Sequence, residues 1–241
     1  MWLHRLVRAL AVPRCDLCGR PLGAIARVDA GGRRFCLRHG IAPLCAECGR
    51  LGARTTPDGL RLCETCELLG VRSESHARAI LLQVGQDLRV LGFKGPSAPI
   101  PVKLVHARDL NPSSSARAAC EGRLAYRHRS GSAPEILGMS VQRGLAPVSC
   151  GRIMAHELGH AWLLERGYRE LPPVKAEGLC ELCAWSWVTS RKRPRASIIA
   201  GRMMANQDPV YGRGFRDALQ AYRVGGLPAL SAWLGSVETG T

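Results

Sequence analysis

The sequence predicts an α+β protein, in which a small cysteine-rich module precedes a larger domain with a small antiparallel sheet and several helices. Two observations predict this division. Seven of the 11 cysteines lie before residue 67, whereas apolar residues beyond that point recur with the spacing of helices and strands. We expect the module to cover residues 1–70 and the larger domain to cover residues 71–241.

The composition excludes several classes of protein. The chain has 241 residues, of which 46% are hydrophobic, which is enough for a core of ordinary size and excludes wholesale disorder. No apolar run approaches the roughly 18 residues of a membrane-spanning helix, and basic residues interrupt the N-terminal segment 1–12. We therefore expect neither a membrane protein nor a secreted one, but a cytoplasmic protein. The net charge of +15 comes mostly from arginine and is weak evidence for a nucleic-acid partner.

The cysteines of the module, together with one histidine, fall into two sets of four. Each set consists of two pairs with a two-residue gap, and 17 residues separate the pairs in the first set and 14 in the second. Such spacing allows four ligands to surround one ion as a tetrahedron. A disulfide scaffold is the alternative, but the odd number of cysteines and the lack of a secretory signal argue against it. The sequence therefore predicts two structural zinc ions, held by Cys15, Cys18, Cys36 and His39 and by Cys45, Cys48, Cys63 and Cys66.

The larger domain shows both helical and strand-like patterns. Apolar residues recur at helical spacing in three segments, and shorter alternating segments indicate strands. The helices are expected at residues 75–91, about 149–165 and 175–188, and the strands at 102–106, 122–127 and 135–141.

Three further features of the domain are expected to be structural. Residues 108–119 are expected to form a loop, and the basic run 191–195 to be a solvated loop. The four cysteines outside the module are expected to be small buried hydrophobic residues, namely Cys120, Cys150, Cys180 and Cys183.

The motif His156-Glu-Leu-Gly-His160 lies in the second expected helix. Two histidines four residues apart share one helix face and can bind the same zinc ion, and Glu157 is then placed to act as a general base toward water. The residues around the motif are apolar, as expected of a buried helix, where these polar side chains would be costly without a metal. The motif therefore predicts a third, catalytic zinc ion.

A catalytic zinc ion needs a third protein ligand and an open position. The following helix contains Glu177 and Glu181, which are four residues apart and therefore lie on one face. We assign Glu177 to the zinc ion and Glu181 to the orientation of a ligand histidine. The alternative for both residues is a solvated acidic face.

The order of these motifs resembles a known family. A LIM-like double zinc finger, an HExxH-Ala-Trp helix and a Glu-Gly-Leu-Cys helix occur in this order in the LIM-containing, ubiquitin-activated peptidases that limit organ size in plants and in their shorter bacterial relatives. The matching stretches are Phe35–His39, Cys45–Cys48, Gly59–Cys66, Met154–Trp162, Gly167–Arg169, Ala176–Cys180 and Asp208–Phe215.

This resemblance implies a glutamate-type zincin (gluzincin) fold, with His156, His160 and Glu177 as ligands and Glu157 as the catalytic glutamate. The chain also departs from the family. The plant members have ubiquitin-interacting helices and a further LIM domain before the matching region, so ubiquitin activation is not carried over. The first finger ends in Cys-x2-His, five residues separate it from the second finger, and Glu181 stands where family members have Gln.

The expected activity is that of a zinc metalloendopeptidase acting on protein or peptide substrates. The tetrahedral intermediate needs a donor for its oxyanion, and our candidate is Tyr211, in the turn 209–212, with a loop-anchoring aromatic as the alternative. Tyr168 is a weaker candidate and is expected to pack against the core. The strand at 135–141 is expected to pair with the substrate backbone, and the zinc-finger module to bind a protein partner or to regulate. The alternative function is an adaptor that binds protein or nucleic acid through its zinc fingers, with an inactive zincin fold.

Overall fold

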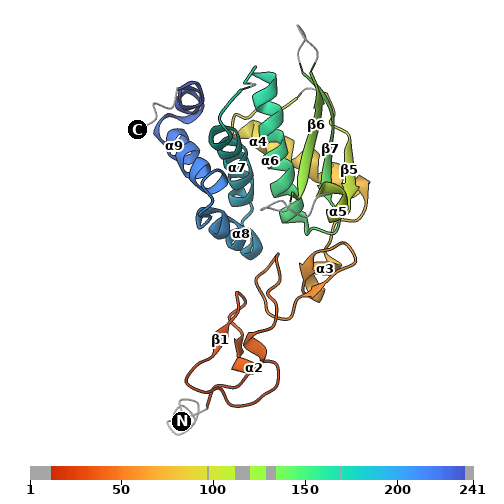
Figure 1. Ribbon diagram of the computed structural model, residues 1–241, viewed down its shortest axis with the longest axis vertical. Helices are drawn as coiled ribbons and strands as arrows, with labels where there is room; N and C mark the ends of the chain where they lie inside the picture. The colour runs from red at the N-terminus through yellow and green to blue at the C-terminus, as the bar shows by residue number, and fades with distance from the viewer. Residues whose placement is uncertain (1–11, 97, 112–119, 129–133, 169, 237–241) are drawn as a thin grey trace, which may run out of the picture. The chain divides into compact units, whose positions relative to one another are not determined.

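The computed structural model describes residues 12–96, 98–111, 120–128, 134–168 and 170–236. The chain divides into two units, Met1–Leu68 and Leu69–Thr241. Figure 1 shows that the first unit consists mainly of loops and small hairpins, whereas helices dominate the second.

The first unit contains two similar halves. Each half has a turn that carries a Cys-x2-Cys pair, a two-stranded antiparallel hairpin and a short helix. Gly19 and Gly49 directly follow the two turns at φ of 69° and 67°, a conformation that favours glycine. The elements are β1 (Arg27–Val28), β2 (Arg34–Phe35) and α2 (Leu37–Gly40), then β3 (Arg54–Thr55), β4 (Arg61–Leu62) and α3 (Glu64–Leu68).

The buried carboxylate of Asp29 links the two halves. The Asp29 carboxylate lies 2.9 Å from the Arg33 guanidinium, and Asp29 also accepts the backbone N–H of Leu51, which belongs to the second half. The apolar cluster beside it is small, formed by Cys15, Leu22, Phe35 and Leu51. A module of this size with so small an apolar core does not fold by apolar burial alone. Metal ligation stabilises modules of this kind.

The sheet of the second unit is mixed, which corrects the expected antiparallel sheet. Its strands are β5 (Val102–Val105), β6 (Gly122–Arg127) and β7 (Glu135–Gln142), in the order β5-β7-β6. β7 pairs antiparallel with β6 but parallel with β5. Alternation of apolar residues predicts the position of each strand but contains no information on its neighbour or direction, so the strand positions were predictable and the pairing was not.

Helices pack in layers beside this sheet. Figure 1 shows α6 (Pro147–Glu165) between the sheet and α7 (Pro173–Ser190), with α9 (Tyr211–Gly235) on the other side of α7. α4 (Glu74–Val90) begins where the Ser73 hydroxyl accepts the His76 N–H and packs on α6 and β5. The three helices expected from the sequence are α4, α6 and α7, and each prediction is confirmed to within two residues at either end.

Three helices in the described part of the second unit were not expected. α5 (Ala107–Leu110) lies in the segment expected to be a loop, of which residues 112–119 fall outside the described ranges. α8 (Pro194–Met204) begins within the basic run, and α9 begins at Tyr211, where a turn was expected. Both α8 and α9 contain glycines that weaken the helical signal of the sequence.

The basic run is only partly solvated, which corrects the expectation of a loop over residues 191–195. Arg191 forms an ion pair with Asp87 of α4, and its guanidinium lies 4.7 Å above the ring of Trp187. Only Lys192 and Arg193 are exposed residues between α7 and α8. Arginine at this position therefore fixes the end of α7 against α4.

Three of the four cysteines in this unit are fully buried, as expected. They are Cys150, Cys180 and Cys183, whereas Cys120 is partly exposed. None of the helices in the described ranges combines the length and apolar character that crossing a bilayer requires.

Candidate functional site

Helices α6 and α7 approach each other closely because small residues line one face of α6. A β-carbon on Gly159 would lie only 2.8 Å from the Cα of Cys180, and one on Gly151 would overlap the Trp187 ring. Ala155 lies between the two glycines at helical spacing and is fully buried. The close approach brings the polar groups of α7 within reach of the histidines on α6.

Three potential ligand atoms converge between the two helices. The Glu177 Oε2 atom lies 3.1 Å from His156 Nε2 and 3.7 Å from His160 Nε2. Ligands bound to zinc at 2.0–2.1 Å in a tetrahedron are about 3.3 Å apart. The Glu177 oxygen is buried and has no hydrogen-bond partner among the described residues, although both histidines are near. These distances and the orphaned oxygen fit a zinc ion held by His156, His160 and Glu177.

The second nitrogen of His156 contacts Glu181. Nδ1 lies 2.9 Å from Glu181 Oε1, and the carboxylate, which is 9% exposed, is positioned to accept the Nδ1–H. This contact leaves Nε2 free for a metal and is the contact that the expected role of Glu181 requires.

The charges of the cluster favour a cation between the helices. Burial lowers the pKa of His156, but the carboxylates of Glu177 and Glu181 outweigh this effect and raise the pKa to about 10. Burial and the neighbouring His156 lower the pKa of His160 to about 4. Burial raises the pKa of Glu177, yet the two histidines more than compensate, so the net pKa is lowered. A divalent cation would supply the positive charge that these carboxylates require.

Cys180 is a neighbour of the two histidines that sequence reasoning missed. Its sulfur and one ring nitrogen of each histidine lie within 4.8 Å of one another. The side chain is completely buried, however, and burial raises the pKa of the thiol well above its ordinary value, whereas a zinc ligand must be a thiolate. Glu177 is therefore the better third ligand. Cys180 lies one helical turn after Glu177, and this spacing indicates that the two residues share a helix face, which was the sequence signal for its position.

Glu157 lies between α6 and the edge of the sheet. The side chain is 6% exposed, and burial raises the pKa of its carboxyl group, although a backbone hydrogen bond from Leu124 in β6 acts in the opposite direction. The contact with β6 depends on Gly122, where a β-carbon would overlap Ile153 and lie 3.1 Å from Glu157 Oε1. A buried carboxylate with a raised pKa is suited to general base catalysis.

The strand beside Glu157 is β6 and not β7, which corrects the expectation that residues 135–141 pair with a substrate. β7 is the central strand: β6 pairs along it and β5 pairs with Met139–Gln142, so only residues 135–138 of the expected segment lack a strand on the β5 side. Within the described sheet, β5 and β6 each pair on one side only, and β6 is the one of these two edge strands that lies beside Glu157.

Tyr211 lies beside the histidines at the first position of α9. Its ring is 6.4 Å from that of His156, with an angle of 29° between the planes, and the residue is 36% exposed. Burial and the nearby carboxylates of Glu177 and Glu181 raise the pKa of Tyr211 to about 12, so its hydroxyl remains a proton donor. Tyr168 is stacked on Trp162 at 6.3 Å, which agrees with the packing role expected for it.

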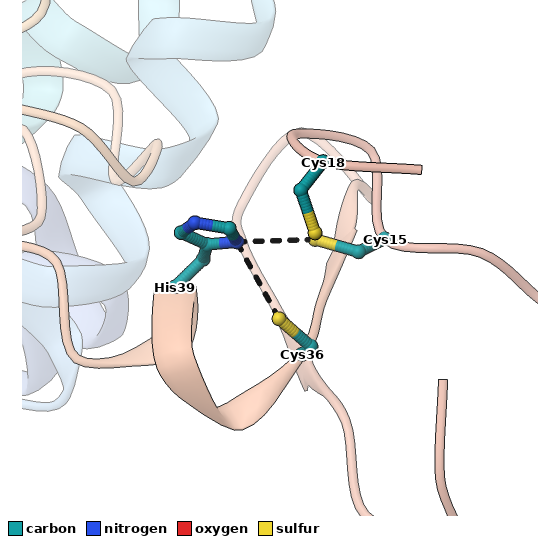
Figure 2. Close-up of side chains that lie close together, drawn as sticks. All are labelled: Cys15, Cys18, Cys36 and His39. Atoms are coloured by element: carbon teal, nitrogen blue, oxygen red, sulfur yellow. Dashed lines mark hydrogen bonds between the residues drawn. The ribbon is translucent and has the colours of Figure 1, made fainter. Parts of the chain in front are cut away.

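The first cysteine-rich set also converges on one point. Figure 2 shows the His39 ring directed toward the cysteines, and its Nδ1 lies 3.5 Å from Cys15 Sγ and 3.4 Å from Cys36 Sγ. Sulfur and nitrogen bound to one tetrahedral zinc ion are about 3.5 Å apart. The four ligand atoms, which include that of Cys18, lie within 4.8 Å of one another.

The second set has the geometry of a site with four thiolates. Cys48 Sγ lies 3.7 Å from Cys63 Sγ, and two sulfurs on one tetrahedral zinc ion are about 3.8 Å apart. Cys45 and Cys66 complete the set within 4.8 Å. Burial raises the pKa of Cys45, but backbone hydrogen bonds from Cys63 and Cys48 outweigh it and lower the pKa, as a thiolate ligand requires. Both sets therefore have the composition and spacing of zinc sites.

Comparison with known proteins relates the chain to one family. A family model described as "DA1-like: Protein DA1" matches residues 102–206, a range that contains the histidines of α6 and the glutamates of α7. Tyr211 lies just beyond this range. No solved structure matches the chain.

Three plant proteins are similar over most of the chain. Protein DA1 of Arabidopsis thaliana is 22% identical over 89% of this chain and 54% of its own length. LIM domain-containing protein HDR3 of Oryza sativa subsp. japonica is 24% identical over 80% of this chain and 48% of its own length. Protein DA1-related 1 of Arabidopsis thaliana is 23% identical over 78% of this chain and 42% of its own length. The chain thus spans about half the length of the curated relatives that it matches, and it is similar to the DA1-like family model across the candidate site.

Proposed function

We propose that the second unit is a zinc-dependent endopeptidase of the gluzincin type. One observation carries this proposal: His156 Nε2, His160 Nε2 and Glu177 Oε2 converge at 3.1 and 3.7 Å, with the buried Glu157 carboxyl group beside them. A scaffold that only binds zinc would have no use for a buried glutamate at this position, since burying it is costly. This feature favours an enzyme over an adaptor with an inactive fold.

Each residue of the site has a separate role in the proposed hydrolysis. When bound, zinc would act as a Lewis acid that polarises the scissile carbonyl group and activates water. Glu157 takes the proton from water and later delivers it to the leaving amine, and burial, which raises its pKa, makes its carboxylate a stronger base toward water. Glu181 holds the His156 ring in the required tautomer through the contact at Nδ1.

Tyr211 is proposed to stabilise the oxyanion of the tetrahedral intermediate. It lies at the site on the side of His156, and with a pKa of about 12 its hydroxyl group stays protonated throughout the neutral range. A hydrogen-bond donor at this point is worth about a hundredfold or more in rate.

The unpaired edge of β6 is proposed to bind the substrate backbone. The Leu124 N–H reaches Glu157, so a peptide added to this edge would run past the general base. Main-chain pairing selects an extended backbone and not a particular side chain. The proposed substrates are therefore unfolded or extended segments of proteins.

The cysteine-rich unit is proposed to hold two structural zinc ions and to serve in protein interaction or regulation. The distances among its ligand atoms match those of tetrahedral zinc. HDR3, a relative of similar sequence, has the words LIM domain-containing in its name. Zinc ligated in this way stabilises small modules that have little apolar core.

The test combines metal analysis with hydrolysis of a quenched-fluorescent peptide library. The purified chain should contain about three zinc ions, and His156→Ala should contain about two. Glu157→Gln should keep about three zinc ions and lose hydrolysis by at least about a hundredfold. The proposal would be wrong if wild-type protein held only two zinc ions and His156→Ala held the same number, or if Glu157→Gln hydrolysed the library at the wild-type rate.

A further inference from the structure

The backbone at Tyr211 is held by the residues that precede α9. Asp208 Oδ1 accepts hydrogen bonds from the backbone N–H of Val210 at 2.8 Å and of Tyr211 at 2.9 Å. The backbone carbonyl of Asp208 accepts the N–H groups of Gly212 and Arg213 at 2.9 and 3.0 Å. One residue thus satisfies four N–H groups at or next to the start of α9, where helices lack internal acceptors.

Two glycines allow the same turn to approach neighbouring backbone closely. A β-carbon on Gly212 would overlap the carbonyl of Asn206, and one on Gly214 would overlap the carbonyl of Val174 and lie 3.2 Å from the Cα of Gly178. Gly178 directly follows Glu177 in α7. The first turn of α9 is therefore in backbone contact with the segment that carries a proposed metal ligand.

The ring of Tyr211 depends on this backbone for its position. The residue is 36% exposed, so packing covers it only in part, and its ring lies 6.4 Å from that of His156. Unwinding of the first helical turn would move the ring by several ångströms, and a misplacement of about 1 Å in an active site can reduce the rate by about a hundredfold.

We propose that Asp208 is a positioning residue for the proposed reaction: its carboxylate caps α9 and so holds the Tyr211 hydroxyl group at the metal centre. This inference rests on the proposed function and on the role given there to Tyr211. It assigns to Asp208 a hydrogen-bonding role, because its side chain accepts two backbone N–H groups, while its charge contributes less to the raised pKa of Tyr211 than burial and the carboxylates of Glu177 and Glu181.

The test compares three substitutions in the full-length chain with zinc bound. Asp208→Ala removes the cap and should lower kcat by at least about fivefold, up to the loss seen for Tyr211→Phe. Asp208→Asn keeps an acceptor oxygen and should stay within about twofold of wild type, because asparagine caps helices as well as aspartate. Asp217→Ala, which removes a half-exposed carboxylate from the same helix, is the matched control and should leave kcat unchanged.

A second measurement does not depend on turnover. The affinity for a phosphonate peptide, an analogue of the tetrahedral intermediate, is measured by calorimetry, together with the zinc content of each variant. Asp208→Ala and Tyr211→Phe should weaken binding, and the double variant should be no worse than Tyr211→Phe alone, because both changes remove the same interaction. Zinc content should stay at the wild-type value.

The outcomes separate the two proposals. Wild-type kcat in Asp208→Ala, with Tyr211→Phe impaired, overturns the positioning role and leaves the proposed function intact. The positioning role is also overturned if the losses of phosphonate affinity multiply in the variant that combines Asp208→Ala with Tyr211→Phe. It is overturned as well if kcat of Asp208→Asn is as low as that of Asp208→Ala. Wild-type behaviour of Tyr211→Phe removes the role of Tyr211 and the positioning proposal together, whereas the Glu157→Gln variant tests the peptidase itself.

Discussion

At the scale of single residues, the candidate site depends on groups that the motif does not contain. The His-Glu-x-x-His pattern predicts which side chains share a helix face, and this part of the site could be read from the sequence. The contact of Glu157 in α6 with Leu124 in β6 involves partners that no local pattern links. Such contacts arise only when the helices and the sheet pack, and therefore they could not be predicted.

The contact between Glu181 and His156 leads to a prediction about metal affinity. Glu181→Gln keeps an oxygen that accepts the His156 Nδ1–H, so zinc affinity and hydrolysis should remain close to wild type. Glu181→Leu removes the acceptor and should weaken the binding of the catalytic zinc ion by about 10- to 100-fold. Competition with a chromophoric chelator measures the affinity. Equal affinities for the Leu and Gln variants would show that Glu181 does not orient the histidine.

At the scale of the elements, the spacing of apolar residues predicted the helices and strands in which such residues recur regularly. It did not predict the helices in which glycine or proline interrupts this spacing. α4, α6, α7 and all three strands follow from apolar spacing. α9 contains glycines and Pro228, and its backbone leaves helical geometry at Gly225 and Gly226, so its signal is broken. The mixed sheet was missed for another reason, because the choice of neighbouring strand is a property of the whole fold.

The end of α9 depends on a buried lysine in α7. Lys175 is 2% exposed, and its Nζ donates to the Trp233 carbonyl at 2.8 Å and to both the carbonyl and the hydroxyl group of Ser236. A cation at the C-terminal end of a helix satisfies carbonyl groups that have no partner within the helix.

We therefore expect Lys175→Met to destabilise the second unit. The apolar side chain removes the hydrogen bonds that the buried Nζ donates to the carbonyl groups of Trp233 and Ser236, which costs about 1–3 kcal/mol of unfolding free energy. Urea unfolding of the zinc-loaded chain measures the change, with Lys192→Met, at an exposed position, as the control. Similar unfolding midpoints for the two variants would contradict the capping role of Lys175.

At the scale of the whole molecule, the three proposed zinc ions differ in how they are held. Four protein ligands surround each proposed ion of the first unit, whereas three surround that of the second. Zinc bound by four protein ligands contributes directly to folding, while a site with an open position exchanges its ion more easily.

Stepwise removal of metal should therefore separate activity from folding. A moderate concentration of a chelator should abolish hydrolysis and remove about one zinc ion per chain while the circular dichroism spectrum stays unchanged. Added zinc should restore hydrolysis. A higher chelator concentration should then unfold the cysteine-rich unit. Simultaneous loss of hydrolysis and of structure at the first step would argue against an open, exchangeable centre in the second unit.

The glycines on the inner face of α6 bear on how the proposed activity would be lost during evolution. Gly159 contributes no ligand, yet a β-carbon there would meet the backbone of Cys180 and push α7, and with it Glu177, away from the histidines; a β-carbon on Gly151 would instead displace the Trp187 ring. A descendant that acquired alanine at Gly159 would keep the complete His-Glu-x-x-His motif but lose the close approach of Glu177 to the two histidines. An inactive relative of this kind would be recognised by a larger residue at the position of Gly159. A survey based on the His-Glu-x-x-His motif alone would classify it as active.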